Sequence, residues 1–157
     1  MKDIVKLLIS VIICQAAGIF GSLFTTPNIP TWYATLKKPG FAPPNWLFAP
    51  VWTLLFLLMG IALYLVWKQG WSSPLVKSAM IIFFIHLVVN ILWSIAFFGM
   101  RAPLIGFFVI VALWFLIILT IIYFSNASKT AGVLLIPYLL WVSFASVLNF
   151  MLYRLNR

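Results

Sequence analysis

The chain has 157 residues, of which 66% are hydrophobic and 7% are charged, and its mean hydropathy is +1.20. These values exclude a water-soluble domain, in which roughly half of the residues are apolar and about a quarter are charged. The net charge of +9 comes from ten Lys and Arg residues at the ends of apolar runs, where they reach lipid headgroups, so it indicates a lipid bilayer and no nucleic acid as partner.

Five apolar runs are long enough to cross the hydrocarbon core, which takes about 20 helical residues. The runs are continuous rather than alternating, which favours helices over the strands of a membrane barrel. We predict an all-α integral membrane bundle of five transmembrane helices in one domain, residues 1–157, multi-pass in the cell membrane of a prokaryote. The expected helices are 4–24, 48–67, 75–98, 104–124 and 133–152. Because the basic residues divide equally between the two ends, charge does not predict which end is cytoplasmic.

The first run carries a face of small and polar residues, Gln15, Gly18 and Ser22, whose spacing predicts close helix packing. A loop at 25–47 follows, in which prolines alternate with aromatic residues: Pro27, Pro30, Trp32, Tyr33, Pro39, Phe41, Pro43, Pro44 and Trp46. Proline lowers the entropy lost on ordering, so we expect a structured aromatic lid. The alternative is a belt of aromatic residues at the membrane surface.

Polar side chains inside the later runs mark the faces that point into the bundle, since hydrocarbon tolerates them poorly elsewhere. The third run carries such a stripe at helical spacing: His86, Asn90, Trp93, Ser94 and Phe97. The fifth carries another, and Pro137 predicts a kink where it begins: Tyr138, Trp141, Ala145, Leu148 and Asn149. The second contributes Trp52 and Phe56. The fourth has almost no polar residue except Thr120, which predicts contact with lipid or a second subunit.

The residues required by most catalytic and metal sites are missing, because the chain has one acidic residue, one histidine and one cysteine. His86 alone could ligate a haem iron, but a hydrogen-bonded packing role is the commoner one, and we predict no metal site. The aromatic interior suits a large, flat, mostly apolar ligand whose polar edge is oriented by Asn90 or Asn149. A tightly packed aromatic core without a cavity is the alternative, and periodicity does not decide between them.

Three blocks of sequence resemble the TspO/MBR family of tryptophan-rich sensory proteins and translocator proteins (peripheral benzodiazepine receptor). The first is Trp32-Tyr33-x-x-Leu36-x-Lys38-Pro39-x-Phe41-x-Pro43-Pro44, continuing to Pro50-Val51-Trp52. The other two are Asn90-x-x-Trp93-Ser94-x-x-Phe97-Phe98-Gly99-x-Arg101 and Pro137-Tyr138-x-x-Trp141-x-x-Phe144-Ala145-x-x-Leu148-Asn149. The match spans nearly the whole chain, with the blocks in order and at the separations typical of the family. Gly40 and Phe41 depart from the family pattern, which often has Ser and Trp there, and members vary at the position of His86.

The resemblance implies a five-helix bundle, commonly a homodimer, that binds porphyrins, haem, sterols or synthetic ligands beneath the lid and requires no cofactor. The residues implied to bind ligand are Trp32, Pro43, Pro44, Trp52, Asn90, Trp93, Phe97, Tyr138, Trp141, Ala145 and Leu148. A receptor or transporter-like role is the main expectation. The alternative is light- and oxygen-dependent porphyrin degradation, with Trp52 and Trp141 as the reactive indoles. A sterol-recognition pattern is matched by Leu148, Tyr153 and Arg157.

Overall fold

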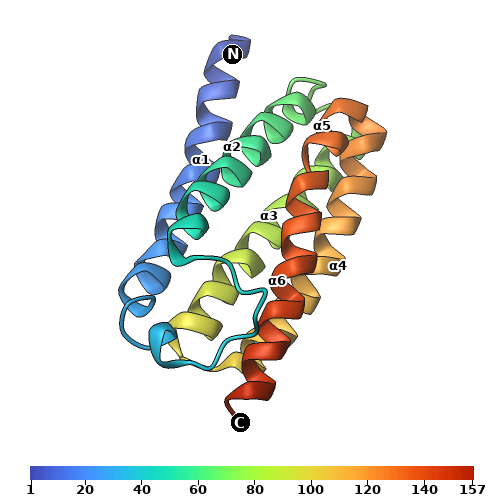
Figure 1. Cartoon of the computed structure of the whole chain (residues 1–157). Coiled ribbons are helices and arrows are strands. Elements are labelled where there is room, and N and C mark those ends of the chain that lie inside the picture. Colours follow the sequence, from blue (N-terminus) through green and yellow to red (C-terminus); the bar gives the residue numbers. More distant parts are fainter.

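Five helical spans, each long and apolar enough to cross a membrane, run up and down in the computed structural model, which describes residues 1–157 (Figure 1). Short turns join consecutive spans, except for the long connection after the first. The helices are α1 (Asp3–Thr25), α2 (Phe48–Trp67), α3 (Pro74–Ser94), α4 (Pro103–Ala127), α5 (Lys129–Leu134) and α6 (Ile136–Leu155). The predicted all-helical membrane fold is therefore confirmed, with α5 and α6 together forming the fifth span.

Proline and serine mark the points at which helices begin. Pro74 and Pro103 stand in the first turns of α3 and α4, where a missing N–H leaves no hydrogen bond unmade. Ser128 caps α5 by accepting a hydrogen bond from the Ala131 N–H at 3.3 Å. Pro137 lies in the first turn of α6, and the fifth span breaks at Leu135, just before it. The kink predicted from Pro137 is thus confirmed.

The third span ends in a turn that the sequence pattern did not predict. After Ser94 the helix widens into a π-helical segment, Ile95–Gly99. The wider turn lets the neighbouring rings of Phe97 and Phe98 both point inward, with ring centroids 4.8 Å apart and both side chains buried. Such widened turns are frequent at functional sites.

Helix α1 packs mainly on α2, and small residues make this contact close. A Cβ atom on Gly60 would lie 2.7 Å from the Val11 Cα, and one on Gly18 would lie 2.6 Å from the Phe56 ring. The contact at Gly60 is with backbone, so glycine is required there for the two helices to cross this closely, whereas a side chain on Gly18 would have to displace the Phe56 ring. The close packing predicted for the small-residue face of the first run is confirmed.

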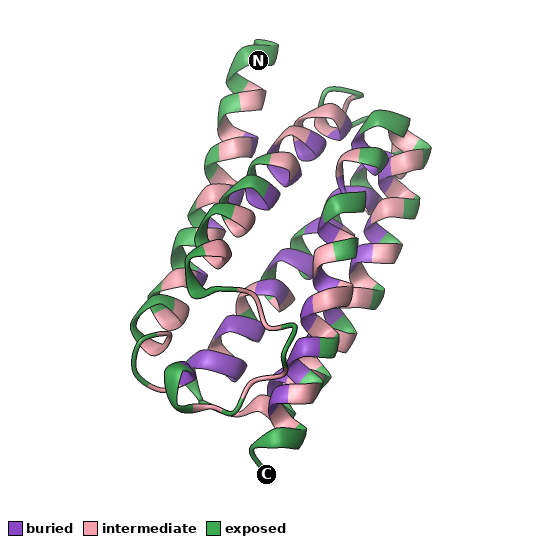
Figure 2. Ribbon diagram, in the orientation of Figure 1, coloured by how far each residue is buried: buried purple, intermediate pink, exposed green.

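Helix α4 lies against α3, α5 and α6. The expectation that the fourth run faces lipid or a second subunit holds for only one side of it, because the side that includes Ile110, Leu113 and Ile117 is buried in the bundle. Phe108, Phe115 and Ile122 of α4 are exposed. Exposed and buried segments alternate along the ribbon of this helix (Figure 2). A helix without a polar stripe can still pack on its neighbours through shape alone.

Residues 25–47, which we call the lid, cross one end of the bundle from α1 to α2 and pass close to α6 (Figure 1). Tyr33, which is 1% exposed, anchors the lid in the core. At its beginning, the Arg101 Nε donates to Asn28 Oδ1 at 3.1 Å. Near the middle of the lid, Asn156 at the end of α6 forms two hydrogen bonds with the backbone of Lys37. Its Nδ2 donates to the Lys37 carbonyl and its Oδ1 accepts from the Lys37 N–H, each at 2.9 Å. The predicted structured lid is confirmed.

Candidate functional site

Aromatic side chains from four parts of the chain converge beneath the lid. Trp52 of α2 lies at the centre, with its ring centroid 6.0 Å from that of Trp93 on α3 and 6.4 Å from that of Tyr138 on α6. Trp141 approaches Phe48 at 6.3 Å. We call this group the aromatic cluster, and its members are Trp32, Tyr33, Phe48, Trp52, Trp93, Phe97, Phe98, Tyr138 and Trp141. The rings of the second, third and fifth spans therefore face one another rather than the lipid.

A small cavity of about 20 Å³, which we call the lid cavity, lies inside this cluster. Its walls come from the lid, α2, α3 and α6: Tyr33, Phe48, Trp52, Trp93, Phe97, Phe98, Trp141, Ala145, Leu148, Asn149 and Leu152. Two of these residues, Tyr33 and Trp141, carry a buried hydrogen-bond donor without a partner, the hydroxyl and the indole Nε1. Burial raises the pKa of the Tyr33 hydroxyl, so this group keeps its proton. The surface of the cavity is almost entirely apolar, so a ligand acceptor would reach these two donors only after the side chains in the wall move.

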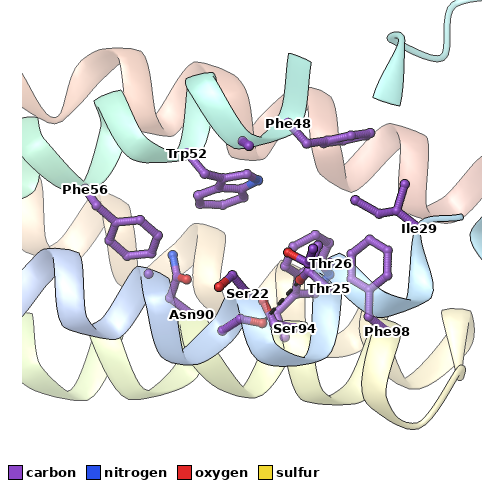
Figure 3. Close-up of a pocket in the computed structure, with 14 residues that line it drawn as sticks. Ser22, Thr25, Thr26, Ile29, Phe48, Trp52, Phe56, Asn90, Ser94 and Phe98 are labelled. Atoms are coloured by element: carbon purple, nitrogen blue, oxygen red, sulfur yellow. Dashed lines mark hydrogen bonds between the residues drawn. The ribbon is translucent and has the colours of Figure 1, made fainter. Parts of the chain in front are cut away.

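A larger cavity of about 100 Å³ lies on the other side of Trp52 and Trp93, against α1, and we call it the α1 cavity (Figure 3). The residues that line it are Gly18, Gly21, Ser22, Thr25, Thr26, Ile29, Phe48, Ala49, Trp52, Phe56, Asn90, Trp93, Ser94 and Phe98. Its α1 wall consists of small side chains and hydroxyls. A Cβ atom on Gly18 would lie 2.6 Å from the Phe56 ring and one on Gly21 would lie 3.2 Å from Ser94 Oγ, so these glycines let α1 approach the other walls of the cavity.

The polar side chains predicted on the third and fifth spans are joined by hydrogen bonds within the bundle. Trp93 Nε1 donates to Asn149 Oδ1 at 3.0 Å, and Asn149 Nδ2 donates to the Pro103 carbonyl at 2.7 Å. Asn149 thus uses both ends of its amide inside the protein. Asn90 Nδ2 donates to the Tyr138 hydroxyl at 2.5 Å, which leaves the Asn90 oxygen without a protein partner. Of the two amides considered for orienting a ligand, only Asn90 has an oxygen that accepts no hydrogen bond from the protein.

Comparison with known proteins decides the family. The sequence model of the TspO/MBR family matches residues 10–154. The chain belongs to the TspO/MBR family. It is 50% identical over 155 residues to the tryptophan-rich protein TspO of Archaeoglobus fulgidus, covering 98% of this chain and 99% of that protein. It is 36% identical to the protein CrtK of Rhodobacter capsulatus, covering 91% and 88%, and 34% identical to the translocator protein of Homo sapiens, covering 87% and 81%.

Most of the ligand-binding residues implied by the TspO/MBR resemblance line one of the two cavities. Trp52 and Trp93 line both, and Asn90 lines the α1 cavity. The others at the lid cavity are Phe97, Trp141, Ala145 and Leu148. Their role in binding ligand stays a prediction.

Four of the implied residues line neither cavity. Trp32 covers the cluster from the lid, with its ring 5.4 Å from that of Phe97. Pro43 and Pro44 lie in the lid itself, before the short helical turn Asn45–Leu47. The Tyr138 hydroxyl points to Asn90 and His86, so it is held inside the bundle. These residues can shape the site without touching a ligand in it.

The residues of the sterol pattern do not form one surface. Leu148 is buried at the lid cavity, whereas Arg157 is exposed beyond the end of α6. Tyr153 follows Leu148 by five positions, which places the two side chains on different faces of a helix. The role of these three residues in sterol recognition stays a prediction.

The α1 wall was absent from the residues predicted for ligand binding. The spacing of Gly18 and Ser22 predicts helix packing alone, but both residues also line the larger cavity. Small residues at these positions can both allow a neighbouring helix to approach and form part of a cavity wall. Nothing in the pattern separates the two roles, since the outcome depends on the angle between the helices.

Proposed function

We propose that this TspO/MBR protein is a membrane receptor or transporter-like protein that binds porphyrin, as haem or protoporphyrin, or another flat hydrophobic molecule within its helix bundle. The observation that carries the proposal is the aromatic cluster around Trp52, together with the unpartnered donors of Tyr33 and Trp141 at the lid cavity. Aromatic faces stack on a flat apolar ligand, and the two donors match an oxygen atom on its edge.

The charge at the lid supports a ligand that carries a carboxylate. Lys38 Nζ lies 4.7 Å from the centre of the Tyr33 ring, and the Tyr33 ring forms part of the wall of the lid cavity. The chain's one acidic residue, Asp3, stands at the start of α1, whereas the lid and the chain's C-terminus lie at the other end of the bundle (Figure 1). An anionic group at the lid would therefore meet basic side chains and no acidic side chain, which favours porphyrins with acidic side chains over neutral sterols.

The cavities are smaller than the roughly 300–1,000 Å³ of pockets for drug-sized ligands. The lid cavity holds about 20 Å³ and the α1 cavity about 100 Å³. Trp52 and Trp93 form a wall common to both, so rotation of these two rings would join the cavities into one larger space. We therefore expect porphyrin binding to be accompanied by side-chain movement, with the lid opening to admit the ligand.

Titration of the purified protein with protoporphyrin in the dark tests the proposal. We expect saturable quenching of tryptophan fluorescence and a shift of the porphyrin absorbance band. The change Trp141→Phe, which removes one free donor, should weaken binding severalfold. Its control is Trp46→Phe, because Trp46 is 71% exposed and should leave affinity unchanged. Absence of saturable binding to the wild-type protein would contradict the proposal.

Illumination of the same complex tests the alternative, porphyrin degradation. Trp52 and Trp141, the two indoles considered as reactive, both line the lid cavity and would lie beside a ligand there. If the protein is an enzyme of this kind, light and oxygen convert the bound pigment into a modified product. The changes Trp52→Phe and Trp141→Phe would then abolish conversion, whereas binding would be weakened severalfold at most and would still be measurable. A pigment that stays intact under light supports binding alone.

A further inference from the structure

Three buried polar side chains form a hydrogen-bonded chain between α3 and α6. His86 Nδ1 lies 2.7 Å from the Phe83 carbonyl oxygen, and His86 Nε2 lies 3.1 Å from the Tyr138 hydroxyl. The same hydroxyl lies 2.5 Å from Asn90 Nδ2. His86 is 0% exposed, Tyr138 is 1% exposed and Asn90 is 3% exposed. Asn90 is the member of the chain that reaches the α1 cavity.

The direction of each hydrogen bond follows from the first one. A carbonyl oxygen can only accept, so His86 Nδ1 carries a hydrogen and donates to Phe83. The ring is neutral, because the chain's one acid is Asp3 at the far end of α1 and a lone buried charge is costly. His86 Nε2 is then a bare acceptor, which takes the single proton of the Tyr138 hydroxyl. The Tyr138 oxygen is left to accept, and the Asn90 amide nitrogen donates to it.

The outcome is a fixed orientation of the Asn90 amide. Its nitrogen is held by Tyr138, and its oxygen accepts no hydrogen bond from the protein and faces the side of the cavity where Ser22 lies (Figure 3). We infer that His86 is a positioning residue, which acts through Tyr138 to turn the oxygen of the Asn90 amide, and not its nitrogen, toward the α1 cavity. The cavity therefore favours flat apolar ligands that carry an N–H or O–H donor next to Asn90. The inference deepens the proposed function and rests on it, because it requires that flat ligands enter the bundle.

The Ser22 and Thr25 hydroxyls on the α1 wall also present hydrogen-bond acceptors to the cavity. Ser22 Oγ donates to the Ile19 carbonyl at 2.6 Å, and Thr25 Oγ1 donates to the Gly21 carbonyl at 3.3 Å. Their protons are used within the helix, so their oxygens remain as acceptors. Trp52 and Ser94 also line the cavity, and each carries a donor that could bind a ligand with an acceptor. The contribution of Asn90 to ligand preference is therefore measured by comparing the same ligands between variants.

Three flat tricyclic probes of nearly equal shape provide the test. Carbazole has an N–H donor, fluorenone has a carbonyl acceptor, and dibenzofuran serves as the nearly apolar reference. Their dissociation constants are measured by calorimetry with the protein in lipid nanodiscs. The quantity compared is the fluorenone constant divided by the carbazole constant, because partitioning into lipid cancels when this ratio is compared between variants.

In His86→Leu the Tyr138 hydroxyl loses its acceptor and turns to the Asn90 oxygen, which rotates the amide and presents its N–H groups to the cavity. The ratio of the fluorenone to the carbazole dissociation constant should fall on the order of tenfold, because carbazole loses a hydrogen bond to Asn90 and fluorenone gains one. Dibenzofuran affinity should stay unchanged. In His86→Gln the side-chain oxygen can take the place of Nε2, so the wild-type ratio should persist. A residue that acted only through packing would alter all three probes alike.

An unchanged ratio in folded His86→Leu overturns the inference, as does failure of the wild-type protein to bind any probe. If His86→Leu does not fold, the variant Tyr138→Phe is used instead. It frees the Asn90 amide, so the ratio of the fluorenone to the carbazole dissociation constant should move toward one. An unchanged ratio in this variant overturns the inference. Failure of the porphyrin proposal is recognised separately. In that case protoporphyrin does not bind, while carbazole and fluorenone still bind with a ratio that depends on His86.

Discussion

The two cavities share a wall but differ in what surrounds it. Trp52, Trp93, Phe48 and Phe98 border both. On the α1 side they face glycines and hydroxyls, and about 100 Å³ stays open. On the α6 side they face Tyr33, Trp141 and aliphatic side chains, and about 20 Å³ remains. Aromatic residues therefore define where this bundle can recognise a flat ligand, whereas small residues define where it has room.

The largest expected effect is a loss of stability when the contact between α1 and α2 is disrupted. Gly60→Ala places a Cβ atom 2.7 Å from the Val11 backbone, so α1 must move away from α2. Overpacking of this kind costs about 1–3 kcal/mol. The melting temperature in detergent should fall by several degrees. Gly40→Ala is the matched control, because no atom lies within 4 Å of the added Cβ there. Equal melting temperatures for the two variants would show that the helix crossing is looser than described.

A second change closes the larger cavity and leaves the smaller one intact. Ser22→Leu adds an apolar side chain to the wall of the α1 cavity, while Ser22 is not part of the lid cavity. Carbazole binding should weaken roughly tenfold, because the ligand and the new side chain compete for one space. Leu23→Phe is the control, since Leu23 is 63% exposed on the lipid side. Carbazole affinity that survives Ser22→Leu would locate the probe elsewhere.

A third change tests the polar group of the smaller cavity. Tyr33→Phe removes a buried hydroxyl that has no partner, so the free energy of unfolding should rise by about 1 kcal/mol. Protoporphyrin affinity should fall severalfold, since a donor to the ligand is lost. Chemical denaturation and the dark titration measure the two effects. Tyr153→Phe, at a half-buried position outside both cavities, is the control. A loss of stability would mean that the Tyr33 hydroxyl has a partner.

The smallest effect concerns the lid. Asn156→Ala removes the two hydrogen bonds to the Lys37 backbone, each at 2.9 Å and at an exposed position. The lid should open more often, by a factor that corresponds to about 1 kcal/mol. Hydrogen exchange at Lys37 should accelerate, with little change in melting temperature. Arg157→Ala, one residue further along, should leave exchange unaltered. Equal exchange in both variants would indicate that Tyr33 alone holds the lid.

The sequence by itself determined the five spans, the lid and the inward faces of α3 and α6. The physical reason is the bilayer: hydrocarbon demands long apolar helices and turns groups such as His86, Asn90 and Asn149 toward one another. The family could also be identified, because its motifs are carried by residues that are adjacent or one helical turn apart.

Only the tertiary structure decided where space remains and which polar atoms are free. The predicted opening among the rings of α2, α3 and α6 is nearly filled, and the larger cavity borders α1 instead. Cavity size depends on helix distances that vary by less than the width of a methyl group, and sequence periodicity carries no such information. The orientation of the Asn90 amide likewise depends on the hydroxyl of Tyr138, which is 48 residues away in the chain. Hydrogen bonds across such separations exist only once the helices have packed.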